Sequence, residues 1–388
     1  MINRIKEKKA TMIALSVCIV LFLLCAGWLH SGRQERDPSA SEFAEYENGM
    51  VIEVLSDNTY QDETADKAWR GEQMLTVQVR TGRYKGETLL AYNYVGPIYS
   101  VPVKAGDNVT LIISTYADGR HTASVYEVDR STGILILLAI FAIIAIFVGG
   151  KSGAKSLIGL FFIALSLFYI LLPGLMKGYP TILMTFSVCV FIAAFSFTVM
   201  SGISRKTVCA FLGTISGVAA ALLFSQFGQL LLRIDGLRLE NVEALMQLNN
   251  TGMKIGLKGL LAAGIIISSL GAVMDVAMGL ASAISELHET DQKLGFRELF
   301  LSGMNIGKDM VGTMTSTLIL AFLGSSFVLI LYLYSLDLAH YQLLNSAFLS
   351  TELISSLACS IGAILSVPIT AAISAASFSS MKGKTGSI

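Results

Sequence analysis

Charged residues are scarce in this chain of 388 residues. Asp, Glu, Lys and Arg make up 14% of it, against about 25% in a typical soluble domain. Hydrophobic residues make up 53%, and the mean hydropathy is +0.65. Acidic and basic residues balance at 28 each, so no excess of positive charge indicates a nucleic-acid partner. Most of the chain is therefore expected to lie in a lipid bilayer.

Catalytic and metal-binding motifs are also missing. The sequence has no CxxC spacing, nucleotide-binding loop, metal triad or Ser-His arrangement. All five cysteines lie inside apolar runs, which argues against a disulfide framework and favours buried, inert thiols. They are Cys18, Cys25, Cys189, Cys209 and Cys359. The sequence thus predicts no enzyme, no cofactor and no metal site.

The chain begins with a basic segment and an uncharged apolar run. Lys and Arg occupy four of the first ten positions, and Thr11–Leu29 then carries no charge. This pattern is that of a signal peptide or a signal anchor. The run is close to the roughly 20 residues that a span needs, and no clean small-x-small cleavage site follows. Leu24 before Cys25 is too large for a lipoprotein site, so we favour an uncleaved anchor over residues 1–30.

Residues 31–132 have a different character, with short β-rich runs separated by Gly, Pro and Asp turns. Val77 and Val79 alternate with polar residues, as they would in a half-buried strand. Five such strands predict a small all-β domain, a barrel of OB or SH3-like type. The predicted strands are Gly49–Leu55, Met74–Thr81, Glu87–Val95, Asn108–Thr115 and Ala123–Val128.

Seven more apolar runs follow in residues 133–388. With the anchor they predict an α-helical polytopic membrane protein of about eight transmembrane helices, with the β-domain between the first and second spans. The runs are Gly133–Val148, Leu157–Met176, Thr181–Met200, Val208–Leu232, Gly259–Ser285, Met310–Leu336 and Leu353–Ser377.

Basic residues set the expected orientation. The basic N-terminus is predicted to be cytoplasmic, which places the β-domain outside the cell membrane. Lys and Arg recur in the segments that would then be cytoplasmic, whereas Leu336–Glu352 on the opposite side has none. One predicted outer loop, between the fifth and sixth spans, departs from this pattern because it also carries Lys and Arg. The bias favours both termini in the cytoplasm.

Two connections have amphipathic patterns. Arg238–Leu248 is typical of a short helix on the outer surface that stops near Gly252. Leu294–Met304 has a similar pattern on the inner side. An ordinary interfacial linker is the favoured interpretation of both, and a re-entrant element is the alternative.

A single carboxylate, Asp275, lies within the sixth predicted span, Gly259–Ser285. A helical projection puts it on one narrow face with small and polar residues, whereas the other side of the helix is apolar. Such a strip predicts close packing against other helices, and an ionisable residue within a span indicates a functional site. The strip comprises Gly264, Ser268, Gly271, Asp275, Gly279, Ser282 and Glu286; the apolar side includes Leu261, Ile265, Ile266, Val273 and Leu280.

Narrow polar strips recur in the next two spans, and together they suggest one shared interior. A packing seam is the equally weighted alternative, and solvation near the membrane boundary also explains Asp309. No Lys or Arg is expected at the depth of Asp275, so a neutral or cation-bound carboxyl is favoured over an ion pair. The candidate substrate- or ion-binding residues are Asp275, Asp309, Thr313, Ser316, Thr317, Ser366 and Thr370.

Three stretches are similar to signature segments of the YibE/F family. They are GAVMDVAMGLASAISEL at Gly271–Leu287, RELFLSGMNIGKDMVGTMTSTLILAFLGSS at Arg297–Ser326 and VPITAAISA at Val367–Ala375. The resemblance implies a bacterial multi-pass plasma-membrane protein. It supplies no substrate, cofactor or catalytic residue.

Three functions compete. The first is a transporter or permease of a small solute or ion, with Asp275 as the coupling or binding carboxylate. The second is a non-transport membrane protein whose β-domain engages an envelope partner. The third, an intramembrane enzyme using Asp275 and Asp309, is disfavoured because the two lie at different depths and lack a glycine-rich context. The small-residue strips permit self-association.

Overall fold

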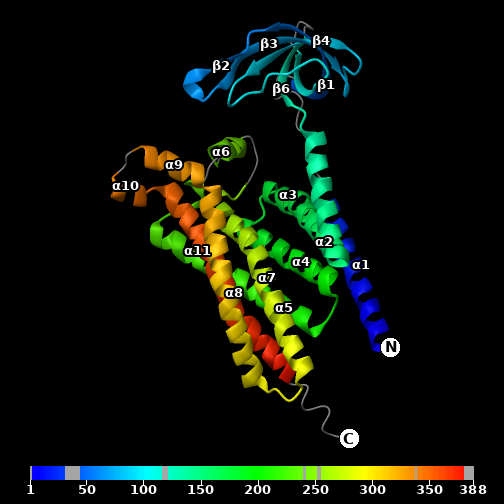
Figure 1. Ribbon diagram of the computed structural model, residues 1–388, viewed down its shortest axis with the longest axis vertical. Helices are drawn as coiled ribbons and strands as arrows, with labels where there is room; N and C mark the ends of the chain where they lie inside the picture. The colour runs from blue at the N-terminus through cyan, green and yellow to red at the C-terminus, as the bar shows by residue number, and fades with distance from the viewer. Residues whose placement is uncertain are drawn as a thin grey trace. The chain divides into compact units, whose positions relative to one another are not determined.

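A computed structural model describes residues 2–30, 44–115, 121–238, 242–250, 255–336 and 339–379. It divides into two compact units, residues 32–147 and residues 1–31 with 148–388. Figure 1 shows the helices and strands of both units.

The first unit contains a closed barrel of five strands. Strand β1 pairs antiparallel with both β3 and β5, and β3–β4 and β5–β6 are also antiparallel. A parallel pairing of β4 with β6 closes the ring. This order, with one parallel pair, is that of an OB barrel rather than of an antiparallel SH3-like one. The strands are β1 (Ala44–Asp57), β3 (Ala68–Val79), β4 (Thr88–Val95), β5 (Asn108–Thr115) and β6 (His121–Val128).

All five predicted strands are therefore confirmed. The expected alternation holds: Leu75, Val77 and Val79 of β3 are buried inside the barrel, and the residues between them face outwards. A short strand, β2 (Tyr60–Asp62), which pairs only with the start of β3, was not predicted.

Buried amides tie a long loop to one end of the barrel. Gln73 donates from Nε2 to Asp57 Oδ2 (2.9 Å), and its Oε1 accepts from the backbone N–H of Val103 (2.9 Å). Asn93 Nδ2 donates to the same Oε1 (2.9 Å) and to the carbonyl of Val101 (3.0 Å). The loop between β4 and β5 is thus hydrogen-bonded to side chains inside the barrel.

The second unit is a helical bundle around α5, α7 and α11, which pack against one another (Figure 1). Helix α8 packs on α11 and α7, and α4 packs on α7 and α5. The helices, with the connecting ones, are α1 (Ile2–His30), α3 (Leu172–Met176), α4 (Thr181–Ser201), α5 (Arg205–Leu232), α6 (Val242–Asn250), α7 (Leu260–Thr290), α8 (Phe296–Ser325), α9 (Phe327–Ser335), α10 (His340–Leu344) and α11 (Ala347–Ser379).

Seven helices in the described part of the chain are long and apolar enough to cross a membrane. Two of the predicted runs fall in one of them, the 46-residue stretch Ser131–Met176. It consists of α2 (Ser131–Ser166), a π-helical turn at Leu167–Leu171, and α3. Helix α2 is broken at Gly150, whose φ of 54° and ψ of −131° are not helical. The break lies between the two predicted runs.

The part of α2 after Gly150 lies antiparallel to α4. Lys155 Nζ donates to the carbonyl of Met200 near the end of α4 (3.0 Å), and Phe162 stacks on Phe195 at 3.5 Å between ring centroids. Helix α1 lies against the same pair, since Phe22 contacts Phe162 at 5.5 Å.

Two predicted boundaries need correction. Leu294–Met304 is not a separate interfacial element, because α8 runs without interruption from Phe296 to Ser325. Its amphipathic pattern reflects packing, since Gly303 lies against Ile284 and Ala371. The span predicted to reach Leu336 ends at Ser325, and α9 follows as a separate helix. The short helix predicted at Arg238–Leu248 exists as α6, but its predicted stop at Gly252 lies outside the described residues.

Candidate functional site: the exposed face of α7 and α8

Asp275 is the sixteenth of the 31 residues of α7. It therefore lies about 22 Å from either end of the helix. Its side chain is exposed, and among the described residues its carboxylate has no hydrogen bond or ion pair. A carboxylate at mid-span without a partner is costly in a bilayer.

The prediction about the faces of α7 is reversed. Gly264, Gly271 and Gly279 are exposed together with Asp275, whereas the apolar side of the helix packs into the bundle. The buried residues include all those that were assigned to the other, apolar side: Leu261, Ile265, Ile266, Val273 and Leu280. Lipid tails are as apolar as leucine, so an apolar helix face can meet either lipid or protein. The pattern separates the two faces but does not say which one is covered.

Contacts between α7 and α8 give the level of Asp275. A Cβ added to Gly279 would lie 2.9 Å from Met310 Cε, and one added to Gly303 would lie 2.7 Å from Ile284 Cδ1. The two helices are antiparallel, so four residues back along α7 correspond to four residues forward along α8. Asp275 is therefore level with residues 312–314 of α8.

The polar residues of α8 are exposed as well: Asp309, Thr313, Ser316 and Thr317. Their hydroxyl groups are satisfied within the helix. Thr313 donates to the carbonyl of Met310 (3.0 Å), Ser316 to Gly312 (3.2 Å) and Thr317 to Thr313 (2.9 Å). Thr313 is level with Asp275 and Thr317 lies about one helical turn beyond it, but neither forms a hydrogen bond to Asp275 in the described structure.

Ser366 and Thr370 belong to a different surface. Both are fully buried on the side of α11 that faces α5, where Thr370 lies against Gly213 and Ser366 against Gly217. Ser366 donates to the carbonyl of Ala363 (2.7 Å). The prediction that the three polar strips share one interior is therefore wrong for the candidate residues: Ser366 and Thr370 form a packing seam with α5, whereas Asp275 and the polar residues of α8 are exposed. Ser268 of α7 does contact α11, through Cys359 Sγ at 3.2 Å.

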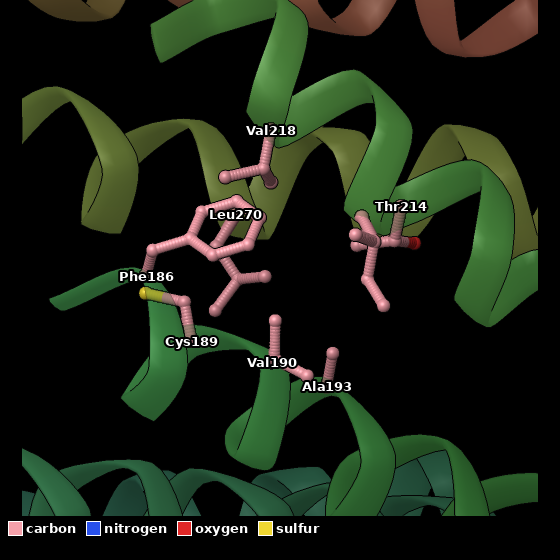
Figure 2. Close-up of a pocket in the computed structure, with 8 residues that line it drawn as sticks. Phe186, Cys189, Val190, Ala193, Thr214, Val218 and Leu270 are labelled. Carbon is pink, nitrogen blue, oxygen red and sulfur yellow. The ribbon is translucent and has the colours of Figure 1, made fainter. Parts of the chain in front are cut away.

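Among the cavities of the described bundle, three have linings without any predicted site residue. The one in Figure 2 lies between α4, α5 and α7 and has room for about one water molecule, about 10 Å³. Its one polar group, the Thr214 hydroxyl, donates to the carbonyl of Ala210 (2.9 Å). The others, about 390 and 140 Å³, lie near Thr181 and Thr207. No cluster of three His, Cys, Asp or Glu residues that could hold a metal occurs in the described residues.

The barrel surface carries a row of side chains that the sequence analysis missed. The strand pairings put Tyr46, Ile112, Ser124 and Tyr92 in register on neighbouring strands β1, β5, β6 and β4. Both tyrosines are exposed, and a nearby exposed residue, Tyr126, meets Tyr46 edge to face at 5.4 Å. The alternation in β4 and β6 could have identified the outward positions, but their neighbours depend on the strand order.

These observations define a class: an α-helical membrane protein with a small OB-type barrel and an acidic, exposed face on two of its spanning helices. Its family follows from the sequence of the helical part. The chain belongs to the YibE/F-like protein family, which matches residues 137–380, and the resemblance noted above is thereby confirmed. Searches of curated proteins and of solved structures found no match.

Proposed function

We propose that this protein moves a small solute or ion across the bacterial plasma membrane, with Asp275 as the binding or coupling carboxylate. One observation carries the proposal: the exposed, unpartnered carboxylate at the middle of α7. A charged residue at the bilayer centre costs about 2.5–3.5 kcal/mol on insertion scales, so a function is the default explanation for it.

The adjacent surface of α8 supports the same proposal. Thr313 offers a hydroxyl oxygen at the level of Asp275 and Thr317 offers one about a helical turn further on, and Asp309 lies on the same helix nearer the end that starts at Phe296. Because each hydroxyl donates to its own helix, its oxygen still has a lone pair for a cation or a solute donor. The polar face could thus pass a ligand along α8 towards Asp275.

The proposed topology has eight crossings, with both termini in the cytoplasm and the β-domain outside. The stretch Ser131–Met176 crosses twice: at about 69 Å it is too long for one crossing of a bilayer about 30 Å thick, and its break at Gly150 allows a reversal. The proposed domains are residues 1–30, 31–132 and 133–388. We propose no enzymatic activity.

Flux measurements test the role of Asp275. The protein is reconstituted into liposomes that contain a pH-sensitive dye. The dye reports the internal pH after a pH step or after external Na⁺, K⁺ or Mg²⁺ is added. We expect the wild-type protein to give flux and Asp275→Asn to abolish it, because the amide has no charge and cannot carry a proton. Glu286→Gln is the matched control, since Glu286 lies on the same exposed strip near the end of α7. Flux that survives Asp275→Asn would refute the proposed role.

The exposed tyrosines of the barrel surface favour a second function, the binding of an envelope protein. Exposed aromatic side chains are typical of the energetic centres of protein interfaces. A photo-crosslinking residue in place of Tyr92 should then capture a partner in intact cells, and one in place of Glu87, an exposed residue just before β4, should not. Deletion of the barrel separates the two functions: flux that persists belongs to the helical unit.

A further inference from the structure

The glycines of the helical unit fall into two groups. On buried faces, an added Cβ would meet a neighbour at once: at Gly217 it would lie 2.5 Å from Val273 Cγ1, and at Gly362 2.8 Å from Ala221 Cβ. On the exposed strips, an added Cβ at Gly264, Gly271 or Gly312 would have no atom within 4 Å, whereas one at Gly279 would lie 2.9 Å from Met310 Cε of α8. Packing within the described chain thus accounts for the first group and leaves the second unexplained.

Two exposed charged residues of α8 are also unmatched. Lys308 and Asp309 are both exposed, and neither has an ion pair among the described residues. Neighbouring residues on a helix point about 100° apart, so these two cannot satisfy each other. They lie at nearly the same level of the membrane.

We propose that a second copy of this chain covers the α7–α8 face. A two-fold axis along the membrane normal brings equal levels of the two copies together, and the resulting interface is isologous. Lys308 of one copy then meets Asp309 of the partner subunit, and the open glycines allow the close helix approach that small residues give in membranes.

Charge complementarity favours a second copy over other occupants. Lipid tails offer no partner for Lys308 or Asp309, whereas a second copy offers each of them the opposite charge at the same level. The dimer completes the site, because the polar face of each copy becomes one wall of a seam that contains both Asp275 carboxylates. The role of this seam in transport rests on the proposed function, whereas the dimer itself does not.

The mass of the protein in lipid nanodiscs tests the assembly without any flux. We expect the wild-type protein to be a dimer. Gly271→Leu places a large side chain on the covered face and should weaken the dimer about five- to 150-fold, the range that overpacking of a filled contact produces. Gly27→Leu is the matched control, because Gly27 of α1 also has open space beside it. A wild-type monomer, as expected if a different protein covers the face, or a dimer that Gly271→Leu leaves intact would overturn the proposal.

Charge reversal tests the two-fold arrangement. Lys308→Glu alone and Asp309→Lys alone each put like charges together across the axis and should weaken the dimer. The double variant restores opposite charges between copies and should recover it. A double variant no more dimeric than the single ones would overturn the arrangement. A dimer without flux would refute transport and leave this inference intact, whereas a monomer with Asp275-dependent flux would do the opposite.

Discussion

The contact of α5 with α7 and α11 at Gly217 makes a quantitative prediction. A Cβ at this position would lie 2.5 Å from Val273 Cγ1, 2.8 Å from Ser366 Cβ and 2.9 Å from the carbonyl oxygen of Gly362. Carbon atoms pack at about 3.5–4.0 Å, so the helices would have to separate by roughly 1 Å. The Gly362 oxygen belongs to the backbone of α11 and cannot rotate away.

Gly217→Val should therefore destabilise the bundle. Overpacking costs about 1–3 kcal/mol, and the three short contacts place this change near the upper end. The better helix propensity of valine returns about 0.5 kcal/mol, which leaves a net loss of about 2–2.5 kcal/mol. A loss of about 1 kcal/mol lowers the melting temperature of a domain of 150–250 residues by about 2–4 °C, so we expect a drop of about 4–10 °C.

A thiol-reactive fluorogenic dye measures this in detergent on a Cys18→Ser, Cys25→Ser background, because Cys25 is exposed, contrary to the prediction of buried thiols, and Cys18 is half-buried. Cys209 of α5 and Cys359 of α11 are buried and become reactive only when the bundle opens. Gly27→Val is the control, since Gly27 has open space beside it, and it should melt at the wild-type temperature. A Gly217→Val variant that also melts there would refute the close packing of α5 with α11.

Two predictions concern the barrel. Gln73→Leu removes the oxygen that accepts hydrogen bonds from the Asn93 amide and the Val103 N–H. Each buried group left without a partner costs about 1–3 kcal/mol, so hydrogen exchange at the Val103 N–H should accelerate markedly. Unchanged exchange would contradict the hydrogen-bond network. The pKa of Asp57 lies below its ordinary 3.8, first because the Thr59 hydroxyl donates to it and then because of the Thr59 N–H and the Gln73 amide. The ionised Asp57 carboxylate therefore stabilises the barrel at pH values above its unfolded-state pKa, and this contribution is lost as the pH falls through the lower folded-state pKa. Asp57→Asn should flatten the decline in barrel stability below about pH 4. Hydrogen-exchange rates measured at decreasing pH follow this decline.

Sequence patterns predicted elements well wherever the chain's own periodicity defines them. The alternation of Val109, Leu111 and Ile113 identified β5, and the length of the apolar run around Asp275 identified α7. Boundaries were less accurate where one pattern fits two structures. The amphipathic start of α8 suits a membrane surface or a helix contact equally, and only the approach of Gly303 to Ile284 distinguishes them.

The sequence by itself determined that this protein spans a membrane, carries a small β-domain and holds one carboxylate deep within a span, because hydrophobic length and side-chain periodicity are local properties of the chain. Only the tertiary structure decided that Ser366 and Thr370 pack against α5 while Asp275 is exposed. The physical reason is that in a bilayer an apolar helix face packs equally well against lipid and against protein. Which face is covered therefore depends on the shapes of the neighbouring helices.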